Sequence, residues 1–321
     1  MRKLIIQIPC YNEAETIGIT LDALPREVPG VDVVEWLVID DGSADNTAEI
    51  AAQHGADHVI RFRVNRGLAR AFTQGLDFCI RSGADIIVNT DADNQYNADD
   101  IPRLIAPILA GEAEIVIGAR PISTIEHFSF MKKVLQRLGS WVVRLASGTE
   151  IADAPSGFRA MTRDAALSLN VFDNYTYTLE TIIQAGRKNI SITSVPVRTN
   201  EDLRPSRLVR SIPSYVQRSL FTIVRIFMTY RPFRFFALPG FVLFVLGLIP
   251  SVRYVYYHFS GQGGGHIPSL IAAAILISLG AVLILMGLLA DLIGINRMLL
   301  EDIRRRLRDL EYRDHTRRFG R

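Results

Sequence analysis

Apolar residues in the first 100 positions occur in short runs, and the stretches between these runs place apolar residues at helical spacing. The runs predict buried strands at residues 4–8, 36–39, 58–62 and 86–89. The stretches between them predict helices that begin at Glu15, Asp45 and Leu68. Strands and helices that alternate in this way form an α/β domain with a mostly parallel sheet.

The second part of the chain has a different pattern, with two long apolar segments. Residues 235–252 carry no charge over 18 positions, and residues 267–290 carry none over 24 positions. About 20 apolar residues span the hydrocarbon core of a bilayer, so each segment predicts a transmembrane helix. Residues 260–265 between them are rich in glycine, which suits a hairpin that returns the chain to its original side.

Positive charge is concentrated around these two segments. Residues 201–321 contain 17 arginines, no lysine and 8 acidic residues, whereas the preceding part has more acidic than basic residues. The positive-inside rule therefore predicts that both ends of the hairpin, and the first 200 residues with them, are cytoplasmic. The arginines suit anionic lipid headgroups, although plain solvated charge is the alternative. The acidic first part argues against nucleic acid as a partner.

These patterns predict four parts of the chain. Residues 1–203 form the α/β domain, residues 204–234 form amphipathic juxtamembrane helices, and residues 235–292 form the transmembrane hairpin. Residues 293–321 form a basic cytoplasmic helix and tail. The juxtamembrane residues could instead pack on the α/β domain, and residues 295–310 suit either a surface helix or a contact in a homo-oligomer.

Polar residues follow the first two predicted strands, at the edge where parallel sheets bind their ligands. The first strand is followed by Pro9, Cys10, Tyr11, Asn12 and Glu13, and the second by Asp40, Asp41, Gly42 and Ser43. Carboxylates at such positions can accept hydrogen bonds from a nucleotide base or from ribose hydroxyls. Taken alone, however, the second segment is also typical of an ordinary turn with a helix cap.

The fourth predicted strand is followed by Asp91, Asp93 and Gln95. In an extended segment, alternate residues lie on the same side, so these three side chains are expected to point together. Oxygen ligands of this kind suit Mg²⁺ or Mn²⁺, which complete their coordination with water and phosphate oxygens. An Asp-x-Asp pair often occurs by chance, but its place after a buried strand favours a metal site for a diphosphate.

Four short motifs support one interpretation together. They are Ile-Pro-Cys-Tyr-Asn-Glu at 8–13, Val-Ile-Asp-Asp-Gly-Ser at 38–43, Asp-Ala-Asp at 91–93 and Ser-Gly-Phe-Arg at 156–159. The chain resembles family-2 glycosyltransferases of the dolichyl-phosphate mannose synthase type, over about residues 4–230. The resemblance implies a GT-A fold and an inverting transfer. The donor would be GDP-mannose or a UDP-hexose, and the acceptor a dolichyl or undecaprenyl phosphate from the bilayer.

The resemblance also implies roles for individual residues. It assigns donor binding to Pro9, Tyr11, Glu13, Ile39, Asp41, Asp91 and Ala92, and metal binding to Asp91, Asp93 and Gln95. The implied catalytic residues are Asp93, Arg120 near the phosphates and Asp153 beside the acceptor. A mobile basic segment corresponds to Arg204 and Arg207, where the usual Gly-x-Ser-Lys reads Arg-Pro-Ser-Arg. Gly67 and Gly75 are expected to be packing positions.

Three other classes of protein share parts of these patterns. A processive polysaccharide synthase usually carries Gln-x-x-Arg-Trp, which neither Trp36 nor Trp141 completes. A nicotinamide-dependent oxidoreductase needs a Gly-x-Gly-x-x-Gly turn, which follows none of the predicted strands. A catalytically silent membrane adaptor remains an alternative, although the intact acids at 91 and 93 argue against it.

Overall fold

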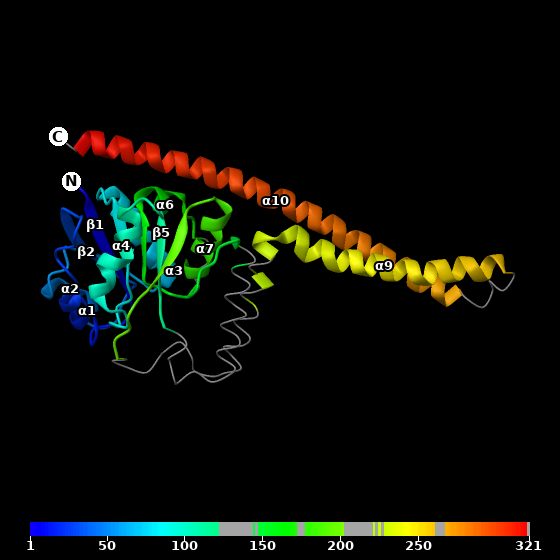
Figure 1. The fold of residues 1–321 in the computed structure, drawn as a ribbon, viewed down its shortest axis with the longest axis horizontal. Helices are drawn as coiled ribbons and strands as arrows, with labels where there is room; N and C mark the ends of the chain where they lie inside the picture. The colour runs from blue at the N-terminus through cyan, green and yellow to red at the C-terminus, as the bar shows by residue number, and fades with distance from the viewer. Residues whose placement is uncertain are drawn as a thin grey trace. The chain divides into compact units, whose positions relative to one another are not determined.

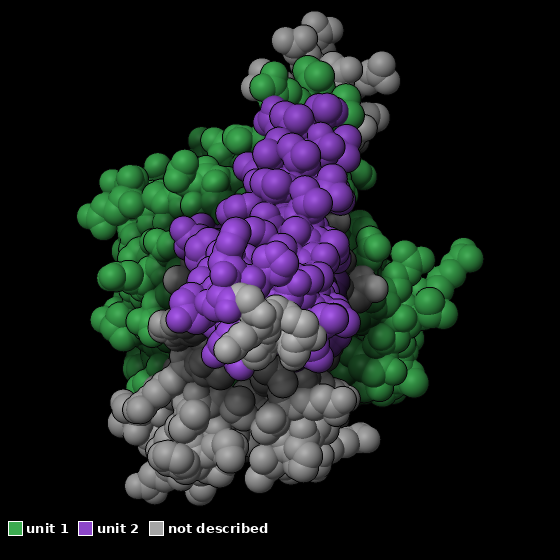
Figure 2. All heavy atoms as spheres, turned by 90° about the vertical axis from the view of Figure 1, so that its right-hand side faces the viewer, with its two compact units in different colours: residues 1–216, 304–321 green, residues 217–303 purple. Residues whose placement is uncertain are grey.

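The computed structural model describes residues 1–121, 144, 147–171, 177–201, 221, 224–225, 228–260 and 267–319 (Figure 1). Contacts within the chain divide it into two compact units. The first unit comprises Met1–Val216 with Arg304–Arg321, and the second comprises Gln217–Ile303 (green and purple in Figure 2). Most of the predicted juxtamembrane segment 204–234 lies outside the described residues.

The first unit is built on a seven-stranded sheet in the order β3-β2-β1-β4-β6-β5-β7. Only β6 runs antiparallel to its neighbours, so the predicted mostly parallel α/β sheet is confirmed. In chain order the strands are β1 (Lys3–Cys10), β2 (Val33–Asp40), β3 (His58–Arg61), β4 (Ile86–Asn89), β5 (Ile115–Ala119), β6 (Arg159–Thr162) and β7 (Ile192–Pro196).

Helices pack on both faces of this sheet, because its central strands are apolar on both sides. Leu4, Ile6 and Ile8 of β1 join a core cluster with residues of α1 and α4, whereas Gln7 lies against α3 on the other face. The helices of this unit are α1 (Ile17–Ala23), α2 (Thr47–Gln53), α3 (Leu68–Arg81), the short 3-10 helix η1 (Ala98–Asp100), α4 (Ile101–Leu109), α6 (Arg163–Ser168) and α7 (Tyr177–Arg187).

The two glycines around α3 serve different purposes. Gly75 is a packing position, as predicted, because a Cβ there would lie 2.9 Å from Cδ1 of Ile39 and closer still to Gln7. Gly67 was expected to have the same role, but its φ of 92° shows that it is needed for a left-handed backbone just before α3. That conformation is strained for residues with a Cβ.

Two long apolar helices, α9 (Pro232–Phe259) and α10 (Ile267–Phe319), pack together as a hairpin. The second unit contains α9 and α10 up to Ile303, whereas the last residues of α10 belong to the first unit. Glycines allow their backbones to approach closely: a Cβ on Gly240 would lie 2.9 Å from the carbonyl oxygen of Gly280. Both helices are long and apolar enough to cross a membrane, over Pro232–Phe259 and Ile267–Leu310. They begin at or near the predicted starts of the spans and extend well beyond the predicted ends.

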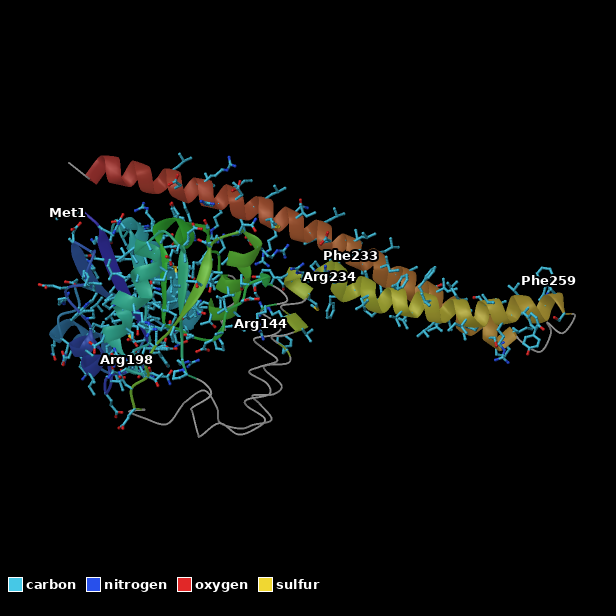
Figure 3. The ribbon with its side chains drawn as sticks, in the orientation of Figure 1. Met1, Arg144, Arg198, Phe233, Arg234 and Phe259 are labelled. Carbon is cyan, nitrogen blue, oxygen red and sulfur yellow. The ribbon has the colours of Figure 1, made fainter. Side chains whose placement is uncertain are left out.

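Many of the described side chains of these helices are exposed apolar groups. Phe233 near the start of α9 and Phe259 at its end are 42% and 85% exposed (Figure 3). Such surfaces are costly in water and favourable in lipid, so the helices indicate membrane anchoring. The helix α10 also continues without a break into the basic C-terminal residues, which the sequence had assigned to a separate helix and tail.

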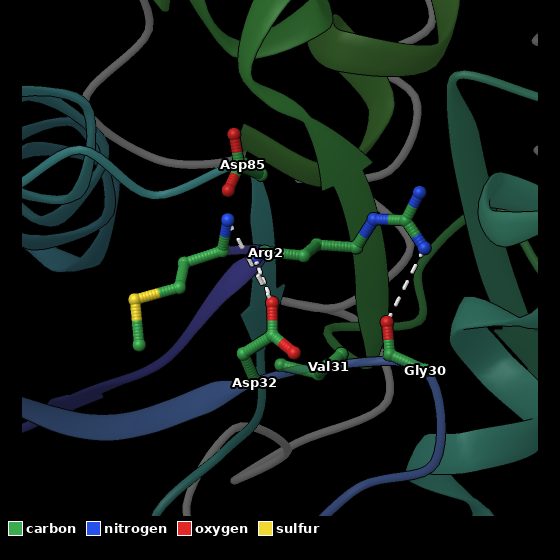
Figure 4. A pocket seen from close by; sticks show the side chains of 6 residues that line it. Arg2, Gly30, Val31, Asp32 and Asp85 are labelled. Atoms are coloured by element: carbon green, nitrogen blue, oxygen red, sulfur yellow. Dashed lines mark hydrogen bonds and ion pairs between the residues drawn. The ribbon is translucent and has the colours of Figure 1, made fainter.

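A shallow recess in the first unit lies where the parallel strands begin, at the edge opposite their carboxyl ends (Figure 4). It is lined by Met1, Arg2, Gly30, Val31, Asp32 and Asp85. The backbone N–H of Arg2 donates to Asp32 Oδ2 at 2.5 Å, and that of Lys3 donates to Asp85 Oδ2 at 2.8 Å. These acids therefore satisfy backbone donors at the start of β1.

Candidate active site

The carboxyl ends of β2, β1 and β4 are adjacent in the sheet, so the loops that follow them meet at one edge. Side chains of one loop hold the backbone of the next. The N–H of Asn12 donates to Ser43 Oγ at 2.8 Å, and the N–H of Glu13 donates to Thr47 Oγ1 at 2.9 Å. On the other side, Thr20 Oγ1 donates to the carbonyl of Ala92 at 2.9 Å. The three predicted motifs are thus joined into one site.

The residues predicted to hold the nucleoside line this edge at different depths. Tyr11 is 43% exposed, whereas Pro9 and Ile39 are buried in their strands. Glu13 accepts a hydrogen bond from Thr16 Oγ1 at 2.9 Å. Tyr11 therefore offers a surface to a ligand, while Pro9 and Ile39 shape the site from below.

Asp40 and Asp41 both support loops. Asp40 is fully buried, and it accepts a hydrogen bond from the N–H of Ser43 at 2.9 Å. Asp41 accepts hydrogen bonds from the N–H groups of Arg66 (2.7 Å) and Gly67 (2.8 Å). Desolvation raises the pKa of Asp41 despite these two donors. No local sequence pattern indicates this pairing, because 25 or more positions separate the partners.

The Asp91–Asp93 pair forms the acidic centre of the site. Desolvation, and then the nearby charge of Asp93, raise the pKa of Asp91 to about 6. Asp93 Oδ1 accepts a hydrogen bond from the N–H of Gln95 at 3.2 Å, across Asn94 in a left-handed conformation. The charge of Asp93 opposes ionisation of Asp91, and a bound cation would relieve this repulsion, so the pair fits a metal ion.

The donor set at this centre is small. Among the residues that the structure describes, no group of three or more His, Cys, Asp or Glu is arranged to hold a metal ion. Mg²⁺ commonly binds through one or two carboxylates, with water and phosphate oxygens completing its shell. Asp91 and Asp93 therefore fit such an ion together with a diphosphate. Gln95 is engaged elsewhere, because its Oε1 accepts from Arg120 Nη1 at 3.1 Å.

Arg120 and Asp153 form an ion pair beside the acidic centre. Arg120 donates to Asp153 through Nε at 2.7 Å, through Nη2 at 3.1 Å and through its backbone N–H at 3.3 Å. Burial, the largest single influence, would lower the pKa of Arg120, but the hydrogen bonding to Asp153 and the nearby charges of Tyr96, Asp153 and Asp91 together raise it. Asp153 has no exposed surface, whereas the Arg120 side chain is 20% exposed. Asp153 can therefore touch a substrate only if the residues that cover it move.

The Ser-Gly-Phe-Arg motif is buried beneath this pair. Arg159 is fully buried and donates to Thr181 Oγ1 at 2.5 Å and to the carbonyl of Thr178 at 3.3 Å. Burial lowers the pKa of Arg159. Phe158 stacks on Tyr96 with ring centroids 5.0 Å apart. The motif therefore connects β6, α7 and the acidic loop, and its arginine acts in packing.

The structure thus brings together the predicted residues of the three strand-end loops with Arg120 and Asp153. Arg204 and Arg207 lie outside the described residues, so their predicted contact with phosphate stays a prediction. Sequence analysis named Gly157 only as part of the Ser-Gly-Phe-Arg motif and assigned no role to Asn89, whereas in the structure Gly157 lies against Asp91 and Asn89 donates a hydrogen bond to the carbonyl of Gly157. A polar residue at the end of an otherwise apolar strand was the available signal for Asn89.

Comparison with known proteins agrees with this geometry. The family model "Glycosyl transferase family 2" matches residues 5–168. An undecaprenyl-phosphate mannosyltransferase of Micrococcus luteus is 31% identical over 207 residues, which cover 61% of this chain and 83% of that protein. A UDP-N-acetylglucosamine–dolichyl-phosphate N-acetylglucosaminyltransferase of Methanococcus voltae is 31% identical over 214 residues, covering 60% and 83%.

A solved structure shares the fold. Glucosyl-3-phosphoglycerate synthase of Mycobacterium tuberculosis, in complex with Mn²⁺, UDP and glucosyl-3-phosphoglycerate, has a TM-score of 0.56 and 22% identity. The match covers 71% of this chain and 80% of that one. The mostly parallel α/β sheet thus has a GT-A-like fold, and the two long apolar helices that follow it indicate membrane anchoring. The chain belongs to glycosyl transferase family 2.

Proposed function

We propose that this protein transfers a sugar from a nucleotide-sugar to a polyprenyl phosphate, with inversion at the anomeric carbon. The proposal rests on one arrangement of residues in the structure. The Asp91–Asp93 pair and the Arg120–Asp153 pair lie together at the sheet edge, in a chain that continues into two apolar helices. The named relatives that act on undecaprenyl and dolichyl phosphates support the choice of a lipid acceptor.

The donor half of the site consists of the strand-end loops. Tyr11, Glu13 and Asp41 would hold the nucleoside, and Asp91 and Asp93 would hold Mg²⁺ or Mn²⁺ beside the diphosphate. When bound, this cation supplies positive charge to the leaving nucleoside diphosphate. The relatives support two kinds of donor, since one is a mannosyltransferase and another uses UDP-N-acetylglucosamine.

The acceptor half centres on Arg120 and Asp153. A lipid monophosphate already carries negative charge near neutral pH, because the second pKa of such groups is about 6, so the attacking oxygen needs no strong base. Arg120 attracts that phosphate and the diphosphate. As Arg120 turns toward phosphate oxygens, it releases the Asp153 carboxylate toward the reacting sugar. Donor binding would thus expose Asp153, because Arg120 would leave Asp153 to bind the phosphates.

The two apolar helices would anchor the enzyme in the membrane where its acceptor resides. Arginines before the first span and after the second favour the cytoplasm for both ends of the hairpin, and so for the catalytic domain. Anchoring confines enzyme and acceptor to one surface, which raises their effective concentration.

A donor and acceptor panel tests the proposal. Membranes containing the enzyme would be incubated with labelled GDP-mannose, UDP-glucose or UDP-N-acetylglucosamine, together with undecaprenyl or dolichyl phosphate. We expect one donor to label a solvent-extractable, acid-labile lipid, and Asp93→Asn to abolish the label. Label in a non-extractable polymer would favour the processive synthase instead. Folded enzyme that transfers none of these sugars to either lipid would refute the proposal.

A further inference from the structure

Gly157 lies directly against the carboxylate of Asp91. A Cβ on Gly157 would stand 2.6 Å from Oδ1 and 2.7 Å from Oδ2 of Asp91, nearer than real Cβ atoms approach such oxygens. Both carboxylate oxygens therefore occupy the space that any other residue at 157 would fill. The position of the Gly157 backbone consequently limits where the Asp91 carboxylate can point.

The Gly157 backbone is itself held on both sides. Its carbonyl accepts a hydrogen bond from Asn89 Nδ2 at 2.9 Å, and its N–H donates to Tyr96 Oη at 3.1 Å. Asn89 precedes Asp91 by two residues and Tyr96 follows it by five. Two residues that flank Asp91 in the sequence, Asn89 and Tyr96, thus hold the carbonyl and the N–H of Gly157.

The amide of Asn89 has a fixed orientation. Asn89 is the neighbour of Gln7 across the β1–β4 pair, and its Oδ1 accepts from Gln7 Nε2 at 2.9 Å. Its Nδ2 therefore faces Gly157 and also Tyr177, whose hydroxyl lies 3.1 Å away. Asn89 and Gln7 are fully buried, so each lost bond would leave a polar group without water.

We propose that Asn89 and Gly157 are positioning residues for Asp91, and that they set the affinity of the site for its divalent cation. The inference rests on the proposed function, since it takes Asp91 to be a metal ligand. Partners that orient metal ligands typically change metal affinity or activity by about 10- to 100-fold when they are replaced. Neither residue contacts the cation in this scheme: Asn89 acts through Gly157, and Gly157 acts on Asp91.

The test compares three variants of the full-length enzyme in detergent. Gly157→Ala adds one methyl group against Asp91, and Asn89→Leu removes the hydrogen bond to Gly157 without adding charge. Tyr177→Phe is the matched control, because it removes the other hydrogen bond of the same Asn89 nitrogen and keeps the stacking on Phe72 (ring centroids 4.0 Å apart). Circular dichroism and thermal unfolding would establish which variants fold.

The readout is the dissociation constant of Mn²⁺, measured by electron paramagnetic resonance in the presence of UDP and, separately, of GDP. We expect about a 10- to 100-fold weaker Mn²⁺ affinity in Gly157→Ala and Asn89→Leu, and less than about a 2-fold change in Tyr177→Phe. A high Mn²⁺ concentration should restore much of the turnover in Gly157→Ala, which a purely structural defect would not allow.

The outcomes separate this inference from the proposed function. Unchanged Mn²⁺ affinity in folded Gly157→Ala, with affinity lost in Asp93→Asn, would overturn the positioning role alone. Wild-type enzyme that binds Mn²⁺ no better than Asp93→Asn would overturn the metal role, and this inference with it. If Asn89→Leu does not fold, the comparison of Gly157→Ala with Tyr177→Phe still decides.

Discussion

The Arg120–Asp153 ion pair should be strongly coupled energetically. Asp153 is completely buried and receives three hydrogen bonds from Arg120, whose side chain is 20% exposed. Removing one partner of a buried ion pair costs about 3–5 kcal/mol, because the other charge is left without compensation. We expect Arg120→Met to lie near the upper end of that range, since it leaves a carboxylate with no access to water. Asp153→Asn should lie near the lower end, because the remaining guanidinium is partly solvated.

The double variant gives the decisive measurement. With both charges gone, it should cost about as much as the worse single variant, well below the sum of the two. Thermal unfolding in detergent without nucleotide would follow the change, and each single variant should lower Tm by roughly 6–20 °C if 1 kcal/mol corresponds to about 2–4 °C at this size. Additive losses in the double variant would show that the two side chains act independently, which would also contradict the proposed change of partner by Arg120.

Three further outcomes follow from the structure and the sequence. Asp93→Asn should lose metal-dependent donor binding in calorimetry. Asp153→Asn, assayed below its lowered Tm, should still bind the donor but lose turnover. Equal loss of donor binding in both variants would contradict this division of roles. Burial, the largest single influence, would raise the pKa of Asp100, but the hydrogen bonds and charge of Arg198, with the charge of Arg103, together lower it. The stabilisation by this pair is therefore present above pH about 4 and lost as pH falls below it. Asp100→Asn should therefore reduce the free energy of unfolding at pH 7 and make it depend less on pH below about 4. An unchanged pH dependence would show that the Arg198–Asp100 pair does not cause the loss of stability in acid. A cysteine in place of Gly263 should react with an impermeant reagent from outside intact cells; reaction only from the cytoplasmic side would reverse the orientation.

The sequence by itself determined the strands and helices whose formation depends on residues close together in the chain. The apolar runs located β1 to β4, because strand burial follows directly from local composition, although β2 begins three residues before the predicted start. The apolar runs also located the two long apolar helices, because the number of residues needed to cross a bilayer follows directly from its thickness. Because parallel strands end at one edge, the strand order along the chain also predicted which loops would form the site.

The tertiary structure decided which distant residues meet. The strand β6 inserts antiparallel between β4 and β5, which brings Gly157 behind Asp91 and Asp153 beside Arg120. No local pattern encodes these contacts, since they depend on how the sheet is ordered and on which side chains can satisfy buried polar groups. For the same reason Asp41 was predicted only to hold a nucleoside, whereas in the folded domain its carboxylate is shared with the backbone before α3. Burial makes such pairings obligatory, because a polar group removed from water must find a partner wherever the fold provides one.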